Sequence, residues 1–186
     1  MKVLSWILNF IFSLFKTPSK VIENPDITPK PVESEPEVSG ARDPFSTCPW
    51  LEVADKELGT KEVTGNGNNP RILEYHSATY LKAHTDSTAW CAAFACWVLH
   101  RAGYKSTISA WARDFLKYGE HLAFPARGCI MVFERNAPGG DSHVAFYTGI
   151  ETIDGYQVLG GNQGDAVSLK VYPKKDLLGC RWPVKA

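Results

Sequence analysis

The sequence lacks an excess of charge of either sign, because 20 Lys and Arg residues balance 20 Asp and Glu residues. A neutral chain has no electrostatic reason to bind nucleic acid, so no nucleic-acid partner is expected. Cysteine is scarce as well: five residues are too few for a miniature disulfide scaffold, and the odd number leaves at least one thiol without a partner inside the chain. With 44% apolar residues, the 186-residue chain fits one globular domain rather than a disordered protein.

The apolar run near the start is short for a full crossing of a membrane. It covers residues 3–15 (VLSWILNFIFSLF) between Lys2 and Lys16, and as a helix it would span about 20 Å of a bilayer core about 30 Å thick. This length suits a secretion signal or a marginal anchor, and an N-terminal helix packed on the domain is the alternative. Because the sequence KTPS that follows is a poor cleavage site, an uncleaved anchor over residues 1–16 is expected.

Residues 17–47 have the composition of a linker. Six of the twelve prolines lie there, and acidic residues outnumber basic ones. Such a stretch buries too little apolar surface to offset the entropy of ordering it. We therefore expect an anchor over 1–16, a linker over 17–47 and a folded domain over 48–186, tethered on the periplasmic side of the inner membrane.

Helix signals come first in the domain, and strand signals follow. The expected helices cover residues 49–58, a segment that Asn69 caps, 88–102 and 109–118. The expected strands cover 129–133, 142–149, 156–159, 166–172 and 180–182. This order predicts an α+β fold in which N-terminal helices pack on a C-terminal antiparallel sheet.

The motif DSTAWCAAF at 86–94 places Cys91 in the first turn of the third expected helix. Unpaired backbone N–H groups and the helix dipole favour an anion there, so we expect this thiol to ionise easily and to act as a nucleophile. A purely structural cysteine is the alternative. Cys96, deeper in the same apolar helix, is expected to be inert packing.

A cysteine nucleophile needs a base, and the base needs an orienting group. His143 has apolar neighbours in its expected strand, where an imidazole is costly unless it has hydrogen-bond partners. Asn162, in the motif LGGNQG after the next strand, can accept the ring N–H and fix the tautomer. The candidate catalytic residues are therefore Cys91, His143 and Asn162, and a satisfied core histidine is the alternative for His143.

Six short motifs are spread over the domain. They are PWLEVA at 49–54, GNNPRI at 67–72, WCAAF at 90–94, HVAFY at 143–147, GGNQG at 160–164 and LGCRWP at 178–183. Together they resemble the NlpC/P60 and CHAP superfamily of papain-like cell-wall hydrolases, and in particular a CHAP-type subgroup common in phages and prophages. The resemblance covers essentially all of 48–186.

This resemblance implies a papain-like fold and cleavage of an amide bond in peptidoglycan, either by a muramoyl-L-alanine amidase or by a peptide endopeptidase, as in a phage or prophage endolysin. It implies Cys91 as nucleophile, His143 as base and acid, and Asn162 as orienter, with no cofactor and no metal. The implied partner is peptidoglycan, next to a membrane reached through the N-terminal segment, and a monomer is expected. A catalytically silent wall-binding module and a thiol peptidase acting on proteins are the alternatives.

Two cysteines depart from the family's pattern. Cys129 follows the glycine after which members often have aspartate, and Cys180 stands where an aromatic residue is common. In an exported domain these thiols could pair with each other or with Cys48. A Cys48–Cys180 disulfide would join the two ends of the domain.

Rival sites are weaker. The other four histidines have no ligand spacing with the cysteines, so no structural zinc is expected. Glu62 and the asparagines within 66–69 could bind calcium, but a turn that caps a helix is favoured. Asp86 is expected either near the cleft or as support for the helix start. For Trp90 and Trp111, core packing is favoured over a groove lining.

Overall fold

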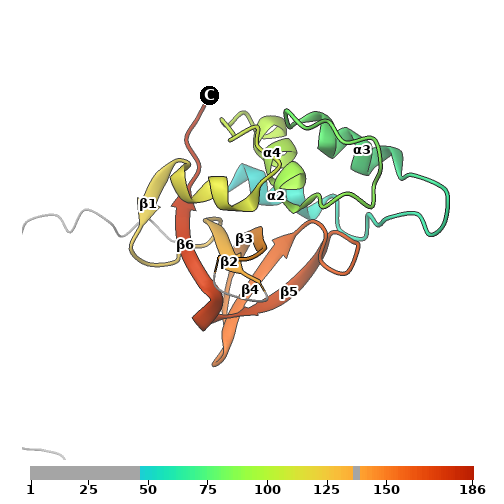
Figure 1. The fold of residues 1–186 in the computed structure, drawn as a ribbon. Helices are drawn as coiled ribbons and strands as arrows, with labels where there is room; N and C mark the ends of the chain where they lie inside the picture. Colours follow the sequence, from blue (N-terminus) through green and yellow to red (C-terminus); the bar gives the residue numbers. More distant parts are fainter. Residues whose placement is uncertain (1–46, 136–138) are drawn as a thin grey trace, which may run out of the picture. The chain divides into compact units, whose positions relative to one another are not determined.

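The computed structural model describes residues 47–135 and 139–186. The expected anchor and all but the last residue of the expected linker lie outside the described residues. Within them the chain is α+β, as predicted: three α-helices precede all six strands (Figure 1).

The helices begin close to where the sequence predicts. They are α2 (Pro49–Asp55), α3 (Pro70–Ser77) and α4 (Cys91–Arg101). The Asn69 side chain accepts the N–H of Arg71 at 2.9 Å, which confirms it as the cap of α3. α4 starts three residues later than predicted, with Trp90 in the N-cap position.

The fourth expected helix is a 3-10 helix, η1 (Ala112–Lys117). The Ser109 hydroxyl accepts the N–H of Trp111 at 3.1 Å and donates to Asp114. Such side-chain bonds compete with an α-helical start, which accounts for the tighter and shorter element.

Six antiparallel strands form one sheet in the order β1-β6-β2-β3-β4-β5. They are β1 (Glu120–Leu122), β2 (Ile130–Glu134), β3 (Ser142–Glu151), β4 (Gly155–Gly160), β5 (Ser168–Pro173) and β6 (Leu177–Trp182). A second short 3-10 turn, η2 (Lys174–Asp176), links β5 to β6. The antiparallel prediction is confirmed, while β1 was not expected, since three residues are too few for a visible alternation.

The sheet curls strongly. Phe133 of β2 and Tyr172 of β5 stack with ring centroids 4.8 Å apart, although β3 and β4 separate their strands in the sheet. In a flat sheet these strands would be about 14 Å apart. The curl therefore brings β5 over β2 and β3 and encloses the space between them.

α4 is the central helix of the domain. Every residue from Cys91 to Leu99 is buried, and the helix packs on β3 and β4 as well as on α2 and α3. Figure 1 shows the three helices on one side of the curled sheet. A helix that is apolar all round has to be covered on all sides, so its first residue is held in a fixed position against the sheet.

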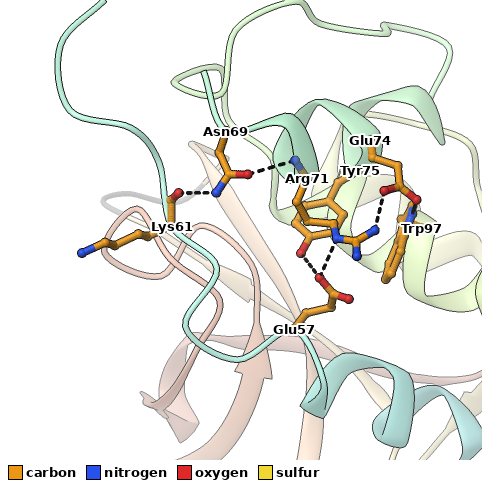
Figure 2. A network of polar contacts seen from close by, with 7 residues as sticks. All are labelled: Glu57, Lys61, Asn69, Arg71, Glu74, Tyr75 and Trp97. Atoms are coloured by element: carbon orange, nitrogen blue, oxygen red, sulfur yellow. Dashed lines mark hydrogen bonds and ion pairs between the residues drawn. The ribbon is translucent and has the colours of Figure 1, made fainter. Parts of the chain in front are cut away.

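A polar network ties the three helices together (Figure 2). Arg71 of α3 pairs with Glu57, which follows α2, at 3.2 Å and also with Glu74. Glu57 accepts the Tyr75 hydroxyl at 2.6 Å, and Glu74 accepts the Trp97 indole N–H of α4 at 3.0 Å. The network holds α4 at Trp97, in the second half of the helix and away from Cys91 at its start.

All five cysteines are buried, and Cys91, Cys96, Cys129 and Cys180 are free thiols. Cys129 and Cys180 lie in hydrogen-bond contact, and Cys48 is close enough to Cys129 to act on it electrostatically. The structure thus gathers the three thiols for which pairing was considered, without a disulfide between Cys48 and Cys180.

Candidate active site

Cys91 is the first residue of α4, and only 7% of it is exposed. Burial raises the pKa of its thiol above the ordinary value, and the backbone N–H groups of Val144, Ala92 and Cys91, with the charge of Arg135, offset only part of that effect. The expectation of an easily ionised thiol is therefore wrong for the resting site. Desolvation outweighs the helix start, and the thiol is neutral.

His143 lies on β3, opposite Phe133 of β2, and is fully buried. The N–H that acts on the Cys91 sulfur belongs to Val144, the next residue along the strand. The fold thus brings Cys91 and the segment containing His143 together, although 51 residues separate them in the sequence. This is the juxtaposition that a cysteine–histidine site requires.

The imidazole is oriented by Gln163, not by Asn162. The Nε2 atom of His143 lies 3.0 Å from Oε1 of Gln163, which is 6% exposed. Asn162 has a φ of 56° in the left-handed region, and this turn directs the next residue toward the ring. The prediction that Asn162 orients His143 is therefore wrong by one position, because the next residue, Gln163, makes the contact.

The contacts of Gln163 fix the tautomer of His143. The side-chain Nε2 of Gln163 donates to the carbonyl of Ser168, so its Oε1 has to face the ring and accept. Nε2 of the imidazole then carries the proton. The other ring nitrogen, Nδ1, is an acceptor, and Nη2 of Arg135 donates to it at 2.9 Å.

Two further side chains complete the surroundings of His143. The ring of Tyr172 stacks on the imidazole with centroids 4.8 Å apart and an interplanar angle of 13°. Nη2 of Arg135 also donates to the Tyr172 hydroxyl at 3.1 Å. Sequence reasoning missed both residues. Tyr172 reaches the ring because the curl of the sheet places β5 over β3, and Arg135 reaches it from the end of the neighbouring strand β2.

The imidazole is neutral in the resting site. Burial lowers the pKa of His143 to about 3; the positive charges of Arg135 and Lys170 act in the same direction, and the bond to Gln163 acts against them. The resting pair is therefore a thiol and a neutral imidazole with an unprotonated Nδ1. Such a pair can transfer a proton from sulfur to nitrogen as the sulfur attacks.

A pocket of about 500 Å³ opens next to these groups. Arg135 and Tyr172 form part of its wall, Asn162 and Lys170 line it too, and the acidic side chains are Glu134, Asp165 and Asp176. The pocket therefore has charges of both signs next to the Arg135–His143 contact. It is large enough for several atoms of a peptide.

Two glycines allow the chain at 160–163 to lie close to its neighbours: Gly161 approaches the start of α4, and Gly160 approaches β3. A Cβ atom at Gly161 would lie 2.6 Å from Cβ of Phe94 and 2.6 Å from the Trp90 ring. A Cβ atom at Gly160 would lie 2.7 Å from Cβ of Ala145. Only glycine permits this approach, which delivers Gln163 to the imidazole.

The other residues singled out by sequence have structural roles. Asp86 is 2% exposed, and its Oδ2 accepts the N–H groups of Val63 and Asn69 at 2.9 and 2.8 Å, so it holds the loop before α3. Glu62 accepts the Trp90 indole N–H at 2.8 Å. Two of the oxygen groups considered for calcium, on Glu62 and Asn69, are thus engaged within the protein. In 47–135 and 139–186, no cluster of three or more His, Cys, Asp or Glu is arranged to hold a metal ion.

Packing predictions have mixed outcomes. Trp90 and Cys96 are fully buried, as expected. Trp111 is 69% exposed, so the prediction of core packing is wrong for it; it is the residue directly before η1.

None of the helices in the described part of the chain combines the length and apolar character needed to cross a bilayer.

Helices packed on a curled antiparallel sheet, with a cysteine at a helix start beside a strand histidine, define a papain-like α+β domain. Residues 83–162 match the family model of the CHAP domain, a span that includes Cys91 and His143. This match supports a place for the matched part of the chain in the NlpC/P60 and CHAP superfamily. CHAP domains are generally hydrolases of amide or peptide bonds with peptidoglycan as substrate. No curated protein matches the chain.

Proposed function

We propose that the domain hydrolyses an amide bond of peptidoglycan with Cys91 as the nucleophile and His143 as the general base and acid. The observation that carries the proposal is the tautomer of His143: Gln163 holds the proton on Nε2 and leaves Nδ1 free of a proton, on a strand whose next N–H acts on the Cys91 sulfur. Gln163 is the orienting group, in the role first assigned to Asn162.

The reaction follows from these positions. Sulfur of Cys91 attacks the amide carbon while its proton passes to Nδ1 of His143, and the oxyanion is stabilised by N–H groups at the start of α4. The imidazolium then protonates the leaving amine, and the C–N bond breaks to give a thioester. Water, deprotonated by the imidazole, releases the acid and restores the thiol. Protonated His143 retains its bond to Gln163 throughout.

Purified cell walls test this proposal. Cys91→Ala and Cys91→Ser should both lower the release of new amines by at least about a thousandfold, because no other group replaces the sulfur. Cys96→Ala, a second buried thiol on the same helix, should retain activity. Undiminished lysis by either Cys91 variant would refute the nucleophile. Mass spectrometry of the released muropeptides distinguishes a muramoyl-L-alanine amidase from an endopeptidase.

The same assays address the alternatives. Binding to walls without new amines from the wild type would identify a silent wall-binding module. Digestion of casein without digestion of walls would identify a thiol peptidase that acts on proteins.

The location of the activity is a second part of the proposal. The apolar run 3–15 and the Pro-rich stretch to 47 favour a monomeric enzyme tethered at the periplasmic face of the inner membrane, as an endolysin of a phage or prophage or as a wall-remodelling enzyme. The full-length protein should sediment with membranes and resist a carbonate wash. Recovery in the cytoplasmic fraction would contradict the tether.

A further inference from the structure

Arg135 is an unusual neighbour for a catalytic base. One of its nitrogens, Nη2, donates both to Nδ1 of His143 and to the hydroxyl of Tyr172. In the mechanism above, Nδ1 is the atom that has to receive the Cys91 proton. While Arg135 donates to it, the same lone pair is unavailable to the thiol.

Arg135 also lacks a counter-ion among the described residues. Across 47–135 and 139–186 it takes part in no ion pair, and its Nε and Nη1 groups make no hydrogen bond. Glu134, the nearest acid in sequence, is engaged instead by Arg113 and by the N–H of Gly139 at 2.8 Å. A half-buried guanidinium whose remaining donors face no protein acceptor is suited to an anion brought by a ligand.

The pocket beside Arg135 indicates which anion fits. Lys170 lines the same pocket and lies 5.4 Å from the centre of the Tyr172 ring, so two cations border the space next to the imidazole. Of the three acids that also line the pocket, Glu134 is engaged by Arg113, whereas Asp165 and Asp176 leave negative charge at its wall, so the site depends on the direct contact with Arg135. A carboxylate matches the planar fork of a guanidinium with two parallel hydrogen bonds. A carboxylate also carries the opposite charge, an attraction that the neutral acceptors on His143 and Tyr172 do not offer to Arg135.

We propose that Arg135 is a specificity-determining residue: it binds a carboxylate of the substrate in the pocket beside Tyr172 and, as it turns to that carboxylate, releases Nδ1 of His143 to the Cys91 thiol. This inference rests on the proposed Cys91–His143 chemistry and adds the class of substrate to it. Stem peptides that keep a free carboxylate near the scissile amide are preferred, and the base is engaged only when such a group is bound.

The direct test compares hydrolysis of muropeptides with free carboxylates and of the same fragments after amidation. The wild type should prefer the free acids by about tenfold or more in kcat/KM, as expected for one charge-assisted contact. Arg135→Gln should lose the preference, and Arg135→Lys should keep part of it, since lysine retains the charge but not the fork. Arg127→Gln, at an exposed arginine elsewhere, should behave as the wild type. An unchanged preference in Arg135→Gln would overturn the proposal.

A second measurement does not depend on peptidoglycan. Iodoacetate and iodoacetamide both alkylate a thiol by forming a C–S bond as iodide leaves and the thiol proton passes to base, but only iodoacetate carries a carboxylate. In the wild type, Cys91 should react faster with iodoacetate by about tenfold, and Arg135→Gln should reverse or abolish this order. Equal ratios in the two proteins, or no alkylation of Cys91 by either reagent, would overturn the carboxylate site. A normal ratio without wall hydrolysis would instead contradict the proposed function.

Discussion

Nε2 of His143 donates to Oε1 of Gln163 across 3.0 Å, inside a part of the domain where both side chains are buried. Because the amide nitrogen of Gln163 is committed to Ser168, this contact allows a single tautomer of the ring. The amide thereby decides which nitrogen can accept a proton from a nucleophile.

Gln163→Ala should lower kcat by about 10- to 100-fold with little change in KM, because loss of a buried hydrogen bond of about 1–3 kcal/mol lets the ring rotate or change tautomer. Gln163→Asn should recover little, since its shorter amide cannot reach both the ring and Ser168. Initial rates on solubilised wall fragments provide the measurement.

Asn162→Gly is the matched control, because glycine keeps the left-handed φ of 56° and removes only the side chain. Asn162 is adjacent in sequence but makes no hydrogen bond to the ring, so loss of its side chain should change kcat only slightly. If Asn162→Gly were as damaging as Gln163→Ala, the assignment of the orienting group would have to return to Asn162. Thermal midpoints of both variants show whether either effect is one of folding.

Tyr172 gives a prediction about stacking. Tyr172→Ala removes a buried ring that stacks on both Phe133 and His143, and should cost about 3–5 kcal/mol of unfolding free energy and most of the activity. Tyr172→Phe keeps the ring and loses only the acceptor for Arg135, so its unfolding free energy should fall by about 1 kcal/mol. Urea unfolding of the two variants measures the difference. Equal losses would show that the hydroxyl, not the ring, stabilises the site.

Much of this arrangement could be predicted from local signals. Pro49, Pro70 and the Asn69 cap mark helix starts through fixed φ angles and side-chain acceptors, and the structure has them there. The positions of Cys91 at a helix start and His143 on a strand follow from the same kind of pattern. These features depend on residues that are adjacent in the sequence, so they can be predicted without the tertiary structure.

The missed features depend on tertiary geometry. Tyr172 reaches His143 only because the sheet curls, and Arg135 reaches it from the end of β2. Asn162 was predicted to face the ring in place of Gln163 because the two amides are neighbours in the sequence. The sequence does not reveal the left-handed φ of 56° at Asn162, the turn after which Gln163 faces the ring. The prediction that the Cys91 thiol ionises easily was wrong because its pKa depends on burial by everything packed around α4, and not on the helix start alone.

Gly161 should not tolerate a side chain. In Gly161→Ala the new Cβ would meet Cβ of Phe94 and the Trp90 ring at 2.6 Å, both parts of the rigid core, so the unfolding free energy should fall by about 1–3 kcal/mol and Gln163 should move away from the ring. Gly164→Ala has free space but a φ of +71°, and should cost only about 1–2 kcal/mol of backbone strain without loss of kcat. Activity, rather than stability, separates the two. Full activity in Gly161→Ala would show that the loop has another way to reach His143.

The buried imidazole makes stability depend on pH in a defined direction. In the folded protein the pKa of His143 is lowered to about 3, mainly by burial, whereas the unfolded chain has the ordinary value of 6.5. Between these values the unfolded state binds the proton and the folded state does not, so the unfolding free energy should decrease as the pH falls from about 7 toward about 3.

His143→Gln removes this titrating group. The unfolding free energy of the variant should therefore fall less steeply over that pH range, whatever its absolute value. His84→Gln, at an exposed histidine, should keep the slope of the wild type. Urea unfolding at several pH values checks this, and parallel slopes for the wild type and His143→Gln would mean that the imidazole is not held neutral by burial.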